Sequence, residues 1–215
     1  MRDLKSYYGI KNASETEIII EKSHFISACK PVTTEEDAKE FVESRRKLHY
    51  NATHNVFSYV IKDKQNIERY SDDGEPQGTA GLPVINLLKV KHIENICIVI
   101  TRYFGGIKLG KGGLVRAYTN SAKSAINKSL FILRKPFAIL HLSVDYPLLG
   151  KVQNEIKSAE IRVKDILYTD KTEFFLYIAF EDYDKTKAKF TDITYGTAVM
   201  DFAGEEYVDI IQDEI

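Results

Sequence analysis

The chain of 215 residues has no tryptophan, two methionines and two cysteines. Cys29 and Cys97 lie far apart and lack the CxxC spacing of zinc and redox sites, so neither a disulfide framework nor a metal site is expected. Cys97 lies in an apolar run and should be a small buried side chain. No apolar run approaches the roughly 20 residues that a membrane-spanning helix needs, so no membrane partner is expected.

Targeting signals are also missing from the sequence. The first residues, MRDLKSYYGI, are charged and polar, unlike the apolar stretch of a signal peptide. We therefore expect a cytoplasmic protein. A hydrophobic content of 44% and a charged content of 28% are ordinary for a globular chain with a real core. The length fits one large domain or two small ones.

Known catalytic and nucleotide motifs fail on particular residues. There is no HExxH and no GxSxG. In GxxxxGK[ST], Gly112 stands where a hydroxyl should bind magnesium, and in GxGxxG, Val115 stands at the third glycine. His54 opens a predicted strand and is kept as a possible site residue, although a lone histidine there is more often structural. We expect no catalytic residue and no cofactor, and favour a non-catalytic protein over an enzyme.

The net charge of −1 hides an asymmetry along the chain. Residues 95–144 contain no aspartate or glutamate but carry eight lysines and arginines. From Asp145 onward, acidic residues exceed basic ones by eight. This pattern indicates two parts with different electrostatic roles, or two parts that attract each other.

A hairpin, a capped helix and a central strand are predicted in the first half. Residues 16–32 are rich in β-branched side chains and predict two adjoining strands. Thr33 and Thr34 precede Glu36 and Asp37, close to a capping box, and predict a helix that ends near residue 48. The most apolar run, residues 93–104, predicts a central strand, followed by a helix over about 113–130. Shorter elements are predicted at 54–61, 67–71 and 81–88.

A change of pattern near Pro136 predicts two domains, 1–135 and 136–215, with residues 133–136 as a linker. Beyond it we predict strands at 137–144, 161–168, 173–180 and from 197, and helices at 148–159 and 184–193. Gly196 fits the end of the second helix. The order βαββαβ is the ferredoxin-like split motif, so the expected fold class is α+β in both domains.

Eight of the twelve glycines lie in two loops, an acidic loop (72–83, DDGEPQGTAGLP) and a basic loop (105–113, GGIKLGKGG). A helix N-terminus normally favours acidic residues by about 0.3–1 kcal/mol, yet the basic loop and the helix after it carry only basic ones. A phosphate or carboxylate bound there would explain this charge. The residues predicted to bind an anion or nucleic acid are Arg102, Lys108, Lys111, Arg116, Gly105, Gly106, Gly110 and Gly113.

The acidic loop offers an internal alternative to an external anion. Its carboxylates could dock on the basic loop through ion pairs and form a rigid junction, which we weigh equally with a ligand site. A divalent cation is a weaker alternative, because DDGE does not match the spacing of a calcium loop. No metal site is therefore predicted. The residues of this motif loop are Asp72, Asp73, Gly74, Glu75, Pro76, Gly78 and Thr79.

The same two loops carry a family resemblance. SDDGEPQGTAGLPV (71–84) followed by VITRYFGGIKLGKGGLVRAY (99–118) resembles the IMPACT/YigZ family, and EKSHFI (21–26) and HNVFSY (54–59) fit it as well. The resemblance covers roughly residues 1–130 by motif, and the remainder by topology and position. Lys111 departs from the family's usual small residue. The motif positions that carry over are Asp72, Asp73, Gly74, Glu75, Pro76, Gly78, Thr79, Gly81, Arg102, Tyr103, Phe104, Gly105, Gly106, Gly110, Gly113 and Arg116.

The resemblance implies an N-terminal domain of the ribosomal protein S5 domain 2-like type and a ferredoxin-like C-terminal domain. That pair is similar to the last two domains of elongation factor G, which implies contact with RNA or the ribosome. Eukaryotic relatives regulate translation by binding a co-activator of a stress kinase, but they carry an extra N-terminal domain that this sequence does not show. The family implies no catalytic residues.

We therefore expect a regulatory binding protein linked to translation, whose basic strand–loop–helix face contacts RNA or ribosome phosphates. A translation-related protein is a further candidate partner. The alternative is an enzyme or sensor that binds a small phosphorylated or carboxylated ligand between the two glycine-rich loops. A third hypothesis is a protein-interaction module in which both loops are purely structural.

Overall fold

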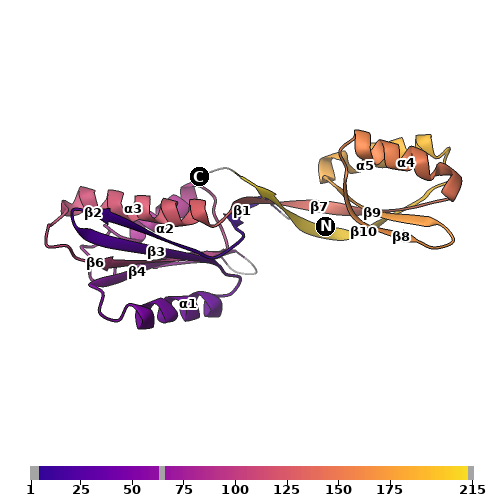
Figure 1. Ribbon diagram of the computed structural model, residues 1–215. Helices are drawn as coiled ribbons and strands as arrows, with labels where there is room; N and C mark the ends of the chain where they lie inside the picture. The colour runs from indigo at the N-terminus through magenta and orange to yellow at the C-terminus, as the bar shows by residue number, and fades with distance from the viewer. Residues whose placement is uncertain (1–4, 63–65, 213–215) are drawn as a thin grey trace. The chain divides into compact units, whose positions relative to one another are not determined.

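The computed structural model describes residues 5–62 and 66–212, which form two compact units (Figure 1). Of these residues, the first unit comprises Tyr7–Arg134 and residues 209–212. The second comprises residues 5–6 and Lys135–Val208. The predicted α+β class is confirmed. The units interleave along the chain, whereas the predicted domains, 1–135 and 136–215, are contiguous.

A five-stranded antiparallel sheet forms the centre of the first unit, with the strand order β2-β3-β6-β4-β5. The middle strand, β6 (Ile96–Tyr103), is the predicted central strand, and nearly all of its residues are buried. Its neighbours bury fewer residues, as expected toward the edges of a sheet. They are β2 (Ser14–Ile20), β3 (Ser23–Pro31), β4 (His54–Lys62) and β5 (Asn66–Ser71).

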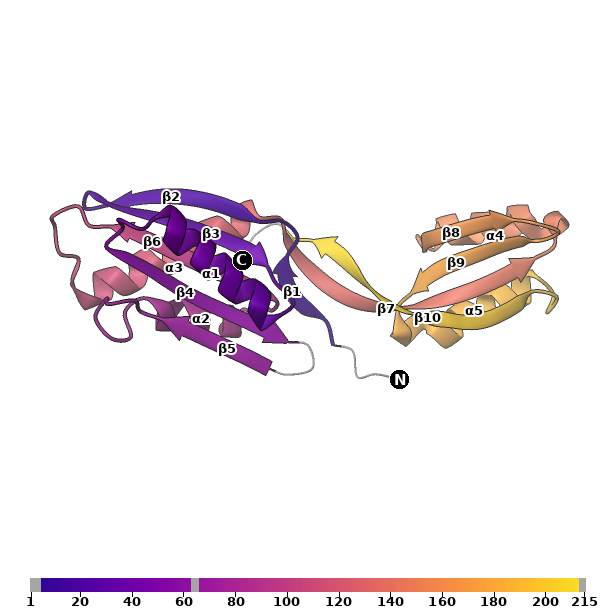
Figure 2. The same cartoon turned by 90° about the horizontal axis from the view of Figure 1, so that it is seen from below.

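Helices cover both faces of this sheet (Figures 1 and 2). On one face, α1 (Glu35–Leu48) packs its buried Ala38 and Val42 against Cys97 and Val99 of β6. The opposite face, with Ile98 at its centre, is covered by α2 (Gly81–Val90) and α3 (Gly110–Lys128). Because side chains alternate along β6, this one strand contributes residues to two hydrophobic cores, one on each face of the sheet.

The start of α1 confirms the sequence pattern. The Oγ1 atom of Thr34 accepts a hydrogen bond from the backbone nitrogen of Asp37 at 3.1 Å, and three acidic residues occupy the first turn. By contrast, α3 begins at Gly110, three residues before the predicted start. Lys111 therefore lies in its first turn, and Arg116 lies in the second turn instead of the first.

A short strand that the sequence did not reveal, β1 (Tyr7–Ile10), pairs antiparallel with the start of β7 (Phe131–Val144). The predicted linker at residues 133–136 is therefore wrong, because these residues lie inside β7. Pro136 is tolerated there since it lies between the stretch that pairs with β1 and the stretch, from Ala138, that pairs with β9.

The second unit has the predicted βαββαβ order. β7 is followed by α4 (Leu149–Ser158), β8 (Arg162–Tyr168), β9 (Thr172–Ile178), α5 (Tyr183–Ile193) and β10 (Val199–Ile211). Short 3₁₀ turns, Tyr146–Leu148 and Phe180–Asp182, precede the two helices. β7 pairs with both β9 and β10, β8 pairs with β9, and both helices lie on one face of the sheet (Figure 2).

Gly196 ends α5 as predicted. Its φ of +74° favours glycine, and its N–H donates to the carbonyl oxygen of Thr191 at 2.8 Å. Both cysteines are fully buried, and burial raises the pKa of each thiol, so neither is a nucleophile. In the part of the chain that the structure describes, no helix is long and apolar enough to cross a membrane.

Candidate functional site

The acidic loop is held together by its own carboxylates. The Oδ1 atom of Asp72 accepts hydrogen bonds from the backbone nitrogens of Ala80 (3.1 Å) and Gly81 (2.8 Å), and Oδ2 accepts one from Gly78 (2.7 Å). These bonds satisfy N–H groups at the start of α2, where no acidic residue lies in the first turn. Asp72 therefore caps α2 from within the loop that precedes the helix.

Asp73 joins the same loop to the start of β4. Its Oδ2 atom accepts a hydrogen bond from the backbone nitrogen of Asn55 at 2.6 Å. The ring of His54 donates from Nδ1 to the carbonyl oxygen of Asp73 at 2.7 Å. A Cβ at Gly74, where φ is +86°, would lie 3.4 Å from that ring. The structure thus brings His54 against the acidic loop, with a structural contact that explains its position.

A buried ion pair connects the acidic loop to the central strand. The Nη1 atom of Arg102 lies 2.7 Å from Oε1 of Glu75, and the two residues are 5% and 7% exposed. The hydroxyl of Tyr118, on α3, donates to the same carboxylate oxygen at 2.7 Å. Burial and the Glu75 carboxylate both raise the pKa of Tyr118, so the phenol stays protonated as a donor. The Nε2 atom of His54 lies 3.8 Å from that oxygen.

Arg102 must therefore be removed from the predicted anion-binding residues. Its guanidinium is taken by Glu75 and by Oγ of Ser23 at 3.3 Å, and it is too buried to reach an external phosphate. For Arg102, the internal alternative is the one that the structure shows. Its Nε atom is buried without a hydrogen-bond partner in the described chain.

Two aromatic rings enclose the Arg102 guanidinium, with Phe25 at 5.3 Å and Phe104 at 5.5 Å from its central carbon. Phe25 is fully buried, but Phe104 is 46% exposed. The backbone nitrogen of Phe104 is fixed by Oγ1 of Thr53 at 3.0 Å. The ion pair therefore supports an aromatic ring that is open to solvent at the start of the basic loop.

The glycines of the basic loop serve different purposes. A Cβ at Gly105 would lie 2.0 Å from the carbonyl carbon of Lys22, so only glycine allows the β2–β3 turn to approach this closely. Gly106 and Gly110 have φ values of +89° and +66°, and a Cβ at either would meet nothing. A Cβ at Gly113 would lie 3.1 Å from Leu109. Gly105 is therefore a packing residue, and its predicted role in anion binding is not supported.

The N-terminus of α3 remains uncompensated. Its N-cap residue, Leu109, makes no side-chain hydrogen bond, and the first turn contains no acidic residue. Lys108, Lys111 and Arg116 are exposed, and none forms an ion pair with a described residue. We call these three side chains and the first turn of α3 the cationic end of α3. It is the part of the predicted basic face that stays available to a partner.

Sequence reasoning missed three residues of this region. Tyr118 donates to Glu75, and its spacing of four residues from Leu114 is the signal that it points inward. Ser23 binds both Arg102 and the N–H of Gly105, and Thr53 holds Phe104. Small hydroxyl residues carry no sequence signal for such long-range contacts. Among the described residues, no group of three His, Cys, Asp or Glu side chains could hold a metal ion.

The chain is similar to known proteins over both units. Residues 21–126 match the Impact N-terminal domain, and residues 142–197 match a domain of unknown function, DUF1949. IMPACT family member YvyE of Bacillus subtilis (strain 168) is 44% identical over 193 residues, which cover 90% of this chain and 89% of YvyE.

Two further matches agree with these. IMPACT family member YigZ of Escherichia coli (strain K12) is 37% identical over 137 residues, covering 62% of this chain and 67% of YigZ. A crystal structure titled only as a hypothetical protein superposes with a TM-score of 0.57 and 28% identity, covering 94% of this chain and 98% of that one.

Proposed function

Because the chain belongs to the IMPACT family, we propose that it is a non-catalytic binding protein linked to translation, and that the cationic end of α3 contacts phosphates of RNA or the ribosome. The observation that carries the proposal is the contrast of charges at this helix start. Asp72, Asp73 and Glu75 are all used inside the fold, whereas Lys108, Lys111 and Arg116 lie in solvent beside unpaired backbone N–H groups.

Phe104 adds a second kind of contact to the proposed site. Phe104 directly precedes the basic loop in the chain, and an exposed aromatic ring can stack on an unpaired base, which is how many proteins hold single-stranded nucleic acid. The Arg102 guanidinium packs against the ring, and Thr53 holds the Phe104 backbone, so the ring loses less side-chain entropy on stacking than a ring without such contacts. We therefore propose single-stranded RNA as the preferred form. The acidic excess beyond Asp145 would repel RNA, so RNA contact should be confined to this site.

The alternative of a small anionic ligand between the two glycine-rich loops has less support. Glu75 already occupies the guanidinium that would have bound such a ligand. An incoming anion would have to displace a buried carboxylate that also accepts a hydrogen bond from Tyr118.

Binding of a fluorescein-labelled single-stranded RNA, followed by anisotropy over a series of salt concentrations, tests the proposal. We expect the triple variant Lys108→Gln, Lys111→Gln and Arg116→Gln to weaken binding at low salt. It should also flatten the slope of log K against log salt by about 2, since each lost phosphate contact on a single strand removes about 0.7.

The matched control is the triple variant Lys47→Gln, Lys91→Gln and Lys157→Gln, which removes the same charge from exposed positions elsewhere. It should keep the parent slope. Equal losses in both triple variants would attribute binding to net charge alone and contradict the proposed site, as would the absence of binding at low salt.

A further inference from the structure

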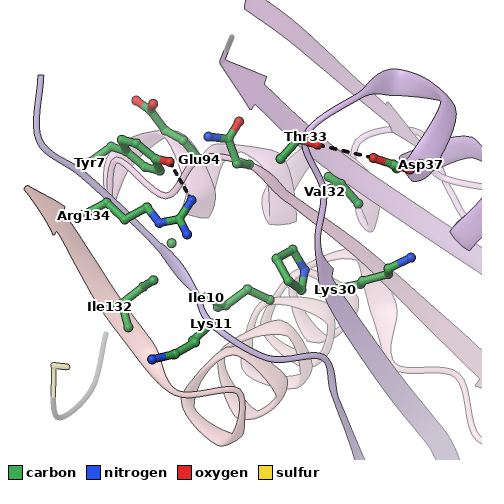
Figure 3. Close-up of a pocket in the computed structure, with 13 residues that line it drawn as sticks. Tyr7, Ile10, Lys11, Lys30, Val32, Thr33, Asp37, Glu94, Ile132 and Arg134 are labelled. Atoms are coloured by element: carbon green, nitrogen blue, oxygen red, sulfur yellow. Dashed lines mark hydrogen bonds between the residues drawn. The ribbon is translucent and has the colours of Figure 1, made fainter. Parts of the chain in front are cut away.

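A hollow of about 320 Å³ lies in the first unit, and none of its lining residues belongs to the two glycine-rich loops. Its walls come from β1, the end of β3 and the chain after it, the residues before β6, and the start of β7 (Figure 3). β3 pairs with β2 only as far as Cys29, so Lys30 and Pro31 extend beyond that partner. Pro31 has no N–H to offer another strand, which leaves this edge of β3 open.

The floor of the hollow is apolar. Ile10, Val32 and Ile132 line it and are each almost completely buried. Figure 3 shows the Arg134 side chain on the same side of the hollow as Ile132, with its guanidinium joined to Tyr7. The hollow thus combines an apolar floor with a nearby cationic side chain. Apolar side chains with a few polar groups are the usual composition of a small-molecule site.

Two side chains that line the hollow keep hydrogen-bond donors unused. Arg134 donates from Nε to Oδ1 of Asp209 at 2.7 Å and from Nη1 to the hydroxyl of Tyr7 at 3.2 Å. Its Nη2 atom has no hydrogen bond to a described residue. The Oδ1 atom of Asn95 accepts from the backbone nitrogen of Lys62 at 2.9 Å, while its amide nitrogen has no described acceptor. The free groups are donors, so they favour a ligand that accepts hydrogen bonds.

The charges around the hollow also favour an anion. Lys11 and Lys30 are exposed, lie on either side of Ile10 in Figure 3, and form no ion pair with a described residue. Of the two lining acids, Glu94 is already paired with Nζ of Lys62 at 2.6 Å. Asp37 is the other, and its Oδ2 accepts a weak hydrogen bond from Thr33 at 3.5 Å. Arg134 is likewise paired, with Asp209 at 2.7 Å, so the two unpaired lysines, Lys11 and Lys30, exceed the one lining acid without an ion pair to a described residue, Asp37.

We propose that this hollow binds a small organic anion, a carboxylate or a phosphate monoester with a short apolar chain. The apolar part would lie on Ile10, Val32 and Ile132, and the anionic head would accept hydrogen bonds from Nη2 of Arg134 and the Asn95 amide, with the exposed Lys11 and Lys30 adding positive charge around the hollow. A volume of 320 Å³ is at the lower end of the range for ligand pockets. The site is independent of the proposed RNA contact.

Titration of the full chain, labelled at isoleucine methyl groups, with hexanoate, hexyl phosphate and hexanamide tests the proposal by NMR. We expect saturable shifts at the methyls of Ile10 and Ile132 with at least one of the two anions, and the tighter anion identifies the preferred head group. Hexanamide has the shape of hexanoate without its charge, and should bind at least ten-fold more weakly.

Exposed lysines provide variants that leave the fold intact. Lys11→Gln with Lys30→Gln should raise the Kd for the tighter anion at least ten-fold, whereas Lys47→Gln with Lys91→Gln should leave it unchanged. Methyl spectra without ligand check that each variant is folded. Shifts that never saturate, equal Kd values for hexanoate and hexanamide, or equal effects of the two double variants would each overturn the proposal.

Discussion

The acidic loop and the basic loop share a glycine-rich composition, but the charged side chains of the acidic loop bind partners inside the fold and the lysines of the basic loop do not. In the acidic loop, Asp72 caps α2, Asp73 holds the start of β4, and Glu75 neutralises a buried guanidinium. In the basic loop, no described acid forms an ion pair with Lys108 or Lys111, and α3 has neither a side-chain cap nor an acidic residue in its first turn. A charged loop that is satisfied inside the fold serves stability, and one that is left open is available for binding.

The same contrast appears between the helix starts. α1 has a threonine cap and three acidic residues in its first turn, and α2 has Asp72. Of these three, α3 alone has a lysine in its first turn and no acid or side-chain cap there among the described residues. Since an acid at this position would stabilise the helix, its absence is a cost to folding that an anionic partner would offset.

The largest expected effect concerns the internal charges. Glu75→Gln leaves the buried Arg102 guanidinium without its counter-charge and should lower the free energy of unfolding by about 3–5 kcal/mol, measured by urea denaturation. The control is Glu68→Gln, which removes an ion pair of equal length, 2.7 Å to Lys89, from a much more exposed position. It should cost less than about 1 kcal/mol. Similar losses for both would mean that burial of the Glu75 pair has no special weight.

Two glycines of the basic loop, Gly105 and Gly112, differ in whether an added methyl group would clash with the surrounding structure. Gly105→Ala places a methyl group 2.0 Å from the backbone of Lys22 and should destabilise the first unit by about 1–3 kcal/mol. Gly112→Ala meets only the end of the Arg116 side chain at 3.7 Å, and should stabilise α3 by about 0.5–1 kcal/mol because alanine is the better helix former. Thermal unfolding followed by circular dichroism measures both changes, and a common sign would contradict the assignment of Gly105 to packing.

The smallest effect links stability to binding at the start of α3. Lys111→Glu adds an acid to the first turn and should raise the free energy of unfolding by about 0.3–1 kcal/mol while weakening RNA binding. Lys123→Glu, in the middle of the same helix, should bring no such gain. Urea denaturation of the two variants measures the change in the free energy of unfolding, and RNA anisotropy measures the change in affinity. A Lys111→Glu protein that is no more stable than Lys123→Glu would show that this helix start carries no uncompensated charge.

Much of the fold was predictable from local patterns. The Thr34 cap, the apolar run of β6 and the βαββαβ order of the second unit each follow from residues close in sequence. The linker prediction failed because Pro136 suggests a break, although a proline between two paired stretches leaves a strand intact. β1 has only four residues, too few for a periodic signal.

The site was predictable in its residue types but not in its pairing. Charge counts named Arg102 and Glu75 correctly as opposites, yet could not decide between an internal and an external partner. A usable signal was present, because Arg102 follows Ile98 and Ile100 at a spacing of two and therefore lies on the same buried face of β6. Lys108 and Lys111 lie beyond the strand, so no such periodicity places them.

The interleaving of the two units has a practical consequence for dissection and for shuffling of gene segments. A single cut near Arg134 would separate that arginine from its counter-ion Asp209, and the carbonyl of Phe131 from the N–H of Gln212. Neither fragment would then contain a complete unit. Expressing the first unit alone requires a short turn that joins residue 134 to residue 209. Exchanging the segment between these residues by recombination requires two crossovers, one at each end.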